Sequence, residues 1–128
     1  MSYDAYQSYQ AVDLGAQTAK ASPLELVLIL MNGLLDELAR ARAHIEHARF
    51  EAKANSLNRS VAMLNGLSSA LDTDSASEVV EQLAELYDYC ARRIHEAGIR
   101  MDVELLDEAV RLLGTVREGW EGVRDANG

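Results

Sequence analysis

The chain has 128 residues and a mass of 14.1 kDa, which is the size of one domain. It carries 12 lysines and arginines against 21 aspartates and glutamates, giving a formal net charge of -9. This balance argues against nucleic acid and anionic lipid as main partners, because both require a basic surface. The one cysteine, Cys90, cannot form an internal disulfide, so nothing calls for an oxidising compartment.

No targeting or membrane-spanning segment is expected. The first residues lack the basic and apolar regions of a signal peptide. The most hydrophobic run, residues 24–35, is interrupted by Glu25, Asn32 and Gly33 and is shorter than the ~20 residues that a membrane span needs. We therefore expect a cytoplasmic protein without membrane insertion.

Residues 1–21 precede the first long helical pattern and are predicted to be a flexible N-terminal segment. They contain Tyr3, Tyr6 and Tyr9, spaced three residues apart, out of seven aromatic residues in the chain. Two readings stay open. The tyrosines cap the end of a helical domain, or the segment is a mobile flap over a binding groove.

The first helix is predicted over about residues 23–48. Ser22-Pro23-Leu24-Glu25 is a helix-start signal, because Ser22 can cap, Pro23 fits the first helical position and Glu25 completes a capping box. Leucines and other apolar residues then recur at steps of three and four, which is the helical period.

Three further helices follow by the same periodicity. The second covers about residues 50–71, and a turn follows over residues 72–75. A capping box from Ser75 to Glu78 begins the third helix, which we expect to end at Gly98 because glycine readily takes the left-handed conformation of a C-terminal cap. Asp102 is expected to cap the fourth helix. The prediction is an all-α, antiparallel up-down four-helix bundle over residues 22–126, a single domain with an N-terminal cap segment.

The helices have more apolar positions than the roughly three per heptad that a bundle core needs. Either these positions broaden the core, or they line exposed apolar grooves that bind a partner helix. On the second reading the predicted partner groove consists of Tyr6, Tyr9, Leu57, Val61, Met63, Leu64, Leu67, Val80, Tyr87, Leu105 and Leu112.

Catalytic and metal-binding patterns are weak. None of the three histidines completes the Glu-x-x-His pattern of di-iron bundles. His44, His47 and Glu51 make at best a weak chelate, and His95 lacks a convincing phosphotransfer context. No glycine-rich phosphate loop occurs. We therefore expect no catalytic residue, no cofactor and no metal, and do not expect an enzyme.

Several patterns, in order along almost the whole chain, resemble the flagellin export chaperone family (FliS). They are Tyr6-Gln7 and Tyr9-Gln10, Ala21-Ser22-Pro23 with the run from Glu25 to Gly33, Leu71-Asp72, Leu86-Tyr87-Asp88-Tyr89 with Arg92-Arg93, and finally Asp102, Leu105 and residues 117–120. The chain departs from the family at Met31, where a tyrosine is usual, and at Ala76-Ser77, where a glycine pair is common.

The resemblance implies a cytosolic chaperone that binds the disordered C-terminal segment of flagellin, prevents its premature polymerisation and delivers it to the flagellar export gate. On this reading Leu67→Asp or Val61→Asp weakens capture, with Val61 the residue more at risk of unfolding the bundle. An alternative of another class is a structural or adaptor bundle that uses its spare apolar stripes to form a homodimer.

Overall fold

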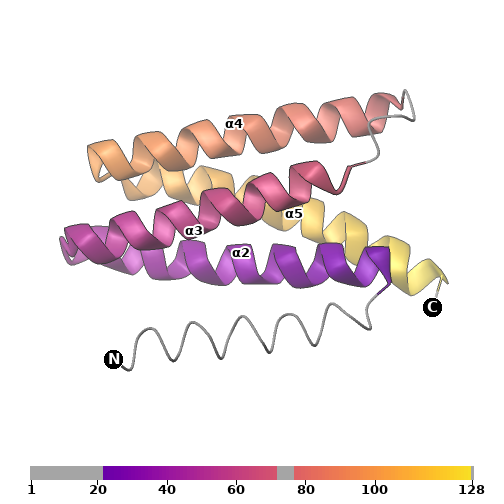
Figure 1. Cartoon of the computed structure of the whole chain (residues 1–128), viewed down its shortest axis with the longest axis horizontal. Helices are drawn as coiled ribbons and strands as arrows, with labels where there is room; N and C mark the ends of the chain where they lie inside the picture. The colour runs from indigo at the N-terminus through magenta and orange to yellow at the C-terminus, as the bar shows by residue number, and fades with distance from the viewer. Residues whose placement is uncertain (1–21, 72–76, 128) are drawn as a thin grey trace.

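The computed structural model describes residues 22–71 and 77–127. They form four helices, α2 (Pro23–Glu46), α3 (Phe50–Ser69), α4 (Glu78–Arg100) and α5 (Val103–Asn127), and this part of the chain contains no strand. Consecutive helices run in opposite directions (Figure 1), which confirms the predicted all-α, antiparallel four-helix bundle. The predicted N-terminal cap, residues 1–21, lies outside the described residues.

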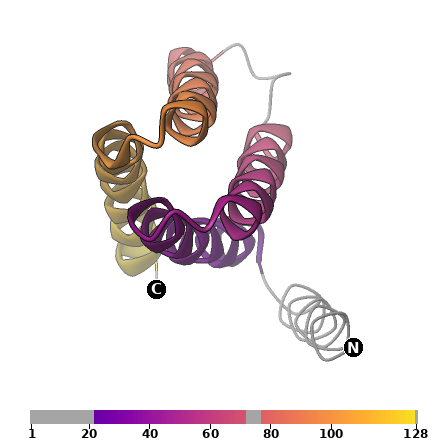
Figure 2. The ribbon, with the colours of Figure 1, turned by 90° about the vertical axis from the view of Figure 1, so that its left-hand side faces the viewer.

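Each helix packs against two neighbours. Helix α2 lies between α3 and α5, and α4 packs against the same two helices on the opposite side of the bundle. Figure 2, which looks along the bundle, shows the four helices arranged as the corners of a ring in the order α2, α3, α4, α5. The ring therefore has four seams, one between each pair of neighbours.

Two of the predicted helix starts are confirmed in atomic detail. The hydroxyl oxygen of Ser22 accepts a hydrogen bond from the backbone N–H of Glu25 at 3.2 Å, and Pro23 is the first helical residue. At the start of α5, a carboxylate oxygen of Asp102 accepts from the backbone N–H of Glu104 at 2.9 Å. Both side chains satisfy N–H groups that have no partner within their helix.

The ends of α2 and α3 come two residues earlier than predicted. Helix α2 stops at Glu46 because Ala48 has a φ of 53°, a left-handed conformation that cannot continue the helix. Helix α3 stops at Ser69, where the backbone tightens and the N–H of Leu71 bonds the carbonyl of Ser68 at 3.2 Å.

The predicted end of α4 at Gly98 is wrong. The helix continues to Arg100, and Met101 adopts the left-handed cap conformation with a φ of 52°. Gly98 is buried inside the helix instead. At the other end the N-cap is Ser77, whose side chain makes no capping hydrogen bond, and the expected cap Ser75 is not among the described residues.

The core is mainly aliphatic and receives side chains from all four helices. Its buried members are Met31, Leu34, Leu38, Ala41, Ile45, Leu57, Leu64, Leu67, Tyr87, Cys90, Ile94, Ala97, Leu106, Ala109 and Leu113. Burial of this apolar surface is the main force that holds the helices together. Among the described helices, none has both the length and the apolar character needed to cross a membrane.

A buried carboxylate fastens α3 to α2. Glu37 of α2 is 5% exposed, and one of its oxygens accepts a hydrogen bond from Nε of Arg59 on α3 at 2.8 Å. Its other oxygen accepts from Arg40 at 2.7 Å. A buried charge is costly unless it is paired and hydrogen-bonded, so these two arginines allow Glu37 to lie inside the bundle.

Hydrogen bonds between side chains nearer the surface join two other pairs of helices. Arg42 of α2 donates to both carboxylate oxygens of Asp107 on α5, at 2.8 and 3.0 Å. These hydrogen bonds hold the pKa of Asp107 below its usual range. Between α4 and α5, Arg93 donates to the hydroxyl of Tyr89 at 3.0 Å, and that hydroxyl donates to Glu108 at 2.9 Å. Ion pairs and hydrogen bonds this close to the surface fix the relative positions of the helices but add little to the free energy of unfolding.

We expect Glu37→Gln to lower the free energy of unfolding by about 1–3 kcal/mol, because it removes the charge that two arginines share at a buried site. Glu46→Gln is the matched control: Glu46 is exposed and pairs with Arg42 on the same helix, so its loss should cost less than about 0.5 kcal/mol. Urea unfolding followed by circular dichroism measures both. Equal losses in the two variants would mean that the buried pair contributes nothing beyond a surface pair.

Candidate functional site

The seam between α3 and α4 is incompletely filled. Two cavities of about 220 and 620 Å³ lie along it and share Val61 of α3 and His95 and Ile99 of α4. Their apolar walls come from both helices. We call this the α3–α4 groove and define it by Ala54, Leu57 and Val61 of α3 and by Ala91, His95 and Ile99 of α4.

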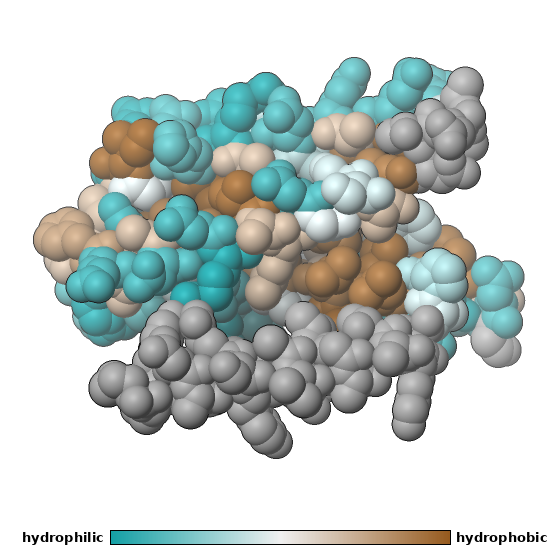
Figure 3. Space-filling view, viewed as in Figure 1, coloured by the Kyte–Doolittle hydropathy of each residue, from teal (hydrophilic) through white to brown (hydrophobic). Residues whose placement is uncertain are grey.

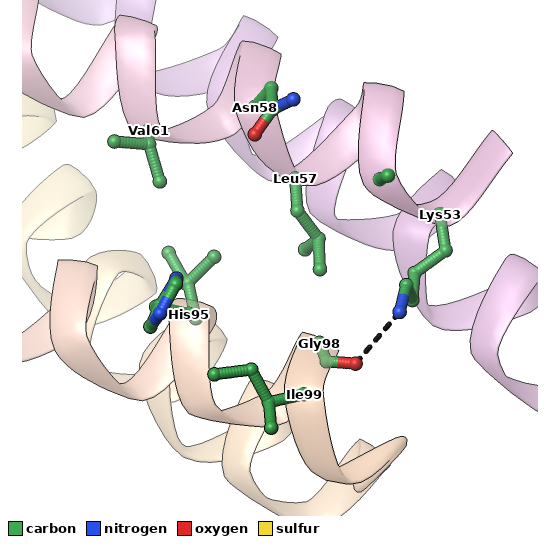
Figure 4. Close-up of a pocket in the computed structure, with 9 residues that line it drawn as sticks. Lys53, Leu57, Asn58, Val61, His95, Gly98 and Ile99 are labelled. Carbon is green, nitrogen blue, oxygen red and sulfur yellow. Dashed lines mark hydrogen bonds between the residues drawn. The ribbon is translucent and has the colours of Figure 1, made fainter. Parts of the chain in front are cut away.

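At one end of the groove the two helices approach closely. A Cβ built on Gly98 would lie only 2.5 Å from Cδ1 of Leu57, so a side chain at this position would collide with the leucine. Nζ of Lys53 on α3 donates to the carbonyl oxygen of Gly98 at 2.8 Å (Figure 4). That carbonyl lies in the last turn of α4, so no backbone N–H of the helix remains to donate to it. Glycine at position 98 therefore serves helix packing rather than helix termination.

Figure 4 shows how the side chains line this part of the groove. Leu57 and Val61 project from α3 toward α4, and His95 and Ile99 project from α4 on the facing side. Ile99, in the last turn of α4, is 69% exposed, a large fraction for an aliphatic side chain that lines the contact between two helices. The groove is thus a mainly apolar surface open to solvent, with Lys53, Asn58, Arg92 and Glu96 also in its lining.

A third cavity, of about 240 Å³, lies at the other end of α3, and we call it the end pocket. It is lined by residues from all four helices, namely Val27, Leu67, Ala70, Leu71, Ser77, Val79, Val80, Leu83, Tyr87 and Trp120. Val79 at its rim is 61% exposed. Figure 3 shows hydrophobic residues in the band between α3 and α4, interleaved with polar ones.

The two rims of the seam differ in charge. From Ala54 to Leu71, α3 and the residues after it carry one charged side chain, Arg59, which is paired with Glu37. The first half of α4 carries four carboxylates, Glu78, Glu81, Glu85 and Asp88, all exposed, before its first basic residue at position 92. A partner in this seam therefore meets a neutral rim on one side and an acidic rim on the other.

Five residues of the predicted partner groove line these cavities. Leu57 and Val61 lie in the α3–α4 groove, and Leu67, Val80 and Tyr87 line the end pocket. Their exposure differs: Val61 and Val80 are partly exposed, whereas Leu67 and Tyr87 are 2% and 1% exposed and belong to the core.

The remaining predicted residues are placed elsewhere. Leu64 is 1% exposed and lies in the core, and Met63 faces α2, where its sulfur would be 3.8 Å from a Cβ built on Gly33. Leu105 and Leu112 are partly buried on α5 and line none of the three cavities. Tyr6 and Tyr9 lie outside the described residues.

The predicted partner groove leaves out several residues that line these cavities, among them Ala54, Ala91, His95 and Ile99 of the α3–α4 groove and Val79 and Trp120 of the end pocket. The predicted end of α4 at Gly98 would place Ile99 outside the helix. The helical pattern continuing past Gly98 was the available signal for Ile99.

The described side chains offer little for catalysis. Within residues 22–71 and 77–127, no group of three or more histidine, cysteine or acidic side chains could hold a metal ion. Burial raises the pKa of the Cys90 thiol to about 11, so the thiol stays protonated at neutral pH. Nδ1 of His44 accepts a hydrogen bond from Arg49 at 2.9 Å, which occupies one nitrogen of the weak chelate considered above.

Comparison with known proteins gives consistent matches over the whole bundle. The family model described as "Flagellar protein FliS" matches residues 5–127. The flagellar secretion chaperone FliSB of Pseudomonas aeruginosa is 36% identical over 119 residues, which cover 93% of this chain and 94% of that protein. The flagellar secretion chaperones FliS of Salmonella typhimurium and Bacillus subtilis are 32% and 28% identical, over 91% of this chain in each case and 87% and 83% of theirs.

We expect Gly98→Ala to change the stability of the bundle by less than about 1 kcal/mol. The one atom in the way of the added Cβ is the terminal Cδ1 methyl of Leu57, which borders a cavity, and alanine gains about 1 kcal/mol in helix propensity. Gly114→Ala in α5 is the control, since nothing lies within 4 Å of its added Cβ, and it should raise stability by about 0.5–1 kcal/mol. Thermal unfolding of both variants measures the difference. A loss well above about 1 kcal/mol in Gly98→Ala would mean that Leu57 cannot move and that this close approach of α3 and α4 requires a glycine.

Proposed function

The chain belongs to the flagellar protein FliS family, and from this we propose that it is a flagellar export chaperone. In this proposal it binds the disordered C-terminal segment of flagellin in the cytosol, prevents the premature polymerisation of flagellin and assists its secretion. It does so by binding alone, without catalysis or cofactor. Delivery of the bound flagellin to the flagellar export gate completes the role.

The observation that carries the proposal is the alignment of three apolar cavities along one seam of the bundle. Val80 and Ile99, which line cavities at opposite ends of that seam, are 19 positions apart, or about 28 Å along α4 at 1.5 Å per residue. A helix of similar length laid between α3 and α4 would contact Val80 at one end of the seam and Ile99 at the other. Apolar grooves of this kind suit an amphipathic helix.

The physical requirements of export favour such a groove. An apolar segment that is disordered in the free subunit self-associates in the cytosol unless its surface is covered. Ordering the segment costs conformational entropy, which offsets part of the gain from burying apolar surface. Binding is therefore strong enough to protect the segment and reversible without chemical energy, so that the export apparatus can remove it.

We assign the residues of the predicted partner groove to this contact in three groups. Leu57, Val61, Leu67, Val80 and Tyr87 form or support the seam between α3 and α4, with Leu64 beneath it in the core. Met63, Leu105 and Leu112 lie on other faces, which a long flagellin segment would reach only by wrapping around the bundle. Tyr6 and Tyr9 are proposed to cover the groove when flagellin is absent.

We expect Ile99→Asp to weaken binding of a flagellin C-terminal peptide at least tenfold, because it places a charge in the exposed apolar wall of the groove. Val123→Asp is the matched control, since Val123 is 43% exposed on α5 and lines none of the three cavities. Isothermal titration calorimetry gives both affinities, and wild-type binding should have a large negative heat-capacity change. Equal affinities of the two variants would exclude the groove, and no binding by the wild type would exclude the function.

Of the two aspartate substitutions that test flagellin binding, Val61→Asp is less disruptive to the fold than Leu67→Asp. Leu67 is 2% exposed, so Leu67→Asp would bury a charge in the core and is expected to unfold the bundle. Val61 is partly exposed in the groove, so Val61→Asp is the less disruptive variant, the reverse of the order expected from the sequence.

We expect deletion of residues 1–10, which removes Tyr6 and Tyr9, to increase binding of a hydrophobic dye and to strengthen flagellin binding. The physical reason is that the groove no longer has to be vacated before the peptide enters. Dye fluorescence and calorimetry measure the two effects. If neither changes, the segment is a passive tail.

Light scattering at micromolar concentration separates this function from that of a dimerising structural bundle. A chaperone that is monomeric and becomes a one-to-one complex with the peptide supports the proposal. A tight dimer that Ile99→Asp splits, with no affinity for the peptide, supports the alternative.

A further inference from the structure

The charged residues of the seam between α3 and α4 are distributed unevenly along its length. In the half that contains the end pocket, residues 62–71 and 77–88 carry four carboxylates and no lysine or arginine. In the other half, residues 50–61 and 89–100 carry five lysines and arginines and two glutamates. The two halves of the seam therefore have opposite net charge.

The sign of the second half does not depend on cations that serve other helices. Arg59 pairs with Glu37 of α2, and Arg93 pairs with Glu108 of α5. The three cations that remain still outnumber the two glutamates of this half; they are Lys53, Arg92 and Arg100. One end of the seam is acidic and the other is weakly basic.

The carboxylates lie on the side of α4 that lines the groove. Glu81, Glu85 and Asp88 follow one another at steps of four and three, the spacing of neighbours along one helix face, and all three are exposed. The same face continues through Arg92 to Ile99, and both of these residues line the groove. Asp88 pairs with Arg92, whereas Glu81 and Glu85 form no ion pair within the described part of the chain. Their charge is therefore available to a partner.

The backbone does not offset this gradient. Helices α3 and α4 run in opposite directions along the seam, so their macrodipoles oppose each other (Figure 1). The side chains then decide the electrostatic potential that a segment in the seam meets. A charge that enters between two helices loses part of its hydration, so a charge of the wrong sign is disfavoured there.

We propose that the seam selects a flagellin helix of complementary charge, which lies with its basic residues beside Glu81 and Glu85 and its C-terminus toward Lys53. This inference rests on the proposed function and adds to it the charge and the direction of the bound segment. The C-terminal end of a helix carries a partial negative charge, and a terminal carboxylate adds a full one. A helix in the reverse direction would bring that negative end to the carboxylates of α4.

The charge of the chain argues against a second copy as the occupant. The net charge is -9, so a second copy would bring further carboxylates to the acidic half of the seam. A basic-edged helix instead gains attraction at α4 and loses nothing at the α3 rim, whose side chains facing the seam beyond Val61 are uncharged.

A charge reversal tests the basic edge of the partner. We expect Glu85→Lys to weaken binding of a flagellin C-terminal peptide to the full-length protein about three- to tenfold at low salt, and less at high salt, because salt screens exposed charges. Glu85 lies beyond the first turn of α4, where a carboxylate would stabilise the helix dipole, so the variant should fold. Calorimetry at two salt concentrations gives the affinities, and circular dichroism checks the fold.

Asp36→Lys is the matched control. Asp36 is exposed in the middle of α2, which lies diagonally across the ring from α4, and it lines none of the three cavities (Figure 2). The two variants change the net charge equally, so Asp36→Lys should keep its affinity within about twofold. Equal affinities of the variants would overturn the inference and leave the chaperone function intact. No binding by the wild type would overturn the proposed function and this inference with it.

A double-mutant cycle locates the contact. Each lysine or arginine of the peptide is changed to glutamine and tested against the wild type and Glu85→Gln. At least one position should lose about twofold or more against the wild type and nothing further against Glu85→Gln. If no position behaves in this way, the proposed contact with α4 is wrong.

Cross-linking tests the direction of the helix. A photoreactive group is placed at either end of the peptide, and the products with the full-length protein are mapped by mass spectrometry. We expect the C-terminal group to react near Ile99 and the N-terminal group near Val80. The reverse pattern, or the same products from both ends, would overturn the direction. A dimer in light scattering that Glu85→Lys strengthens, without peptide binding, would assign the seam to a second copy instead.

Discussion

The contact between Leu57 and the backbone of α4 at Gly98 closes one end of the seam on which the proposed function depends. The absence of a side chain at Gly98 lets the leucine reach the surface of α4, and Lys53 fastens the same point through the Gly98 carbonyl. These contacts fix one end of the α3–α4 seam. The exposed position of Ile99 follows, because it is the next residue of α4 after a glycine that faces the core.

Ion pairs join α2 to its two neighbouring helices, whereas apolar cavities remain open between α3 and α4. Glu37 with Arg59 joins α2 to α3, and Arg42 with Asp107 joins α2 to α5. Protein interiors are normally packed to crystal-like density, and cavities lower stability. The cavities between α3 and α4 therefore lower the stability of the free protein. A partner helix that fills them would bury apolar side chains that are exposed to solvent in the free bundle.

The sequence was sufficient for the architecture, because the architecture follows from local patterns. The period of the apolar residues gave four helices, and the caps at Ser22 and Asp102 were found from side-chain chemistry that acts within a single turn. The ends predicted at about residues 48 and 71 lie two residues late and the end predicted at residue 98 is wrong, since each end depends on how the chain meets its neighbours. Ala48 and Met101, neither of them glycine, take the left-handed conformations, while the glycine that resembles a terminator lies inside α4.

For the site, the sequence determined that the helices carry surplus apolar residues and that the chain resembles the FliS family. Only the tertiary structure decided which of those residues face solvent. Leu64 and Val61 follow the same helical period on α3, yet one is 1% exposed and the other lines the groove. Periodicity specifies a direction around a helix axis, whereas exposure depends on how far the neighbouring helix lies in that direction. Gly98 and Leu57 meet across this seam although they are 41 positions apart in the chain, and no local pattern contains their contact.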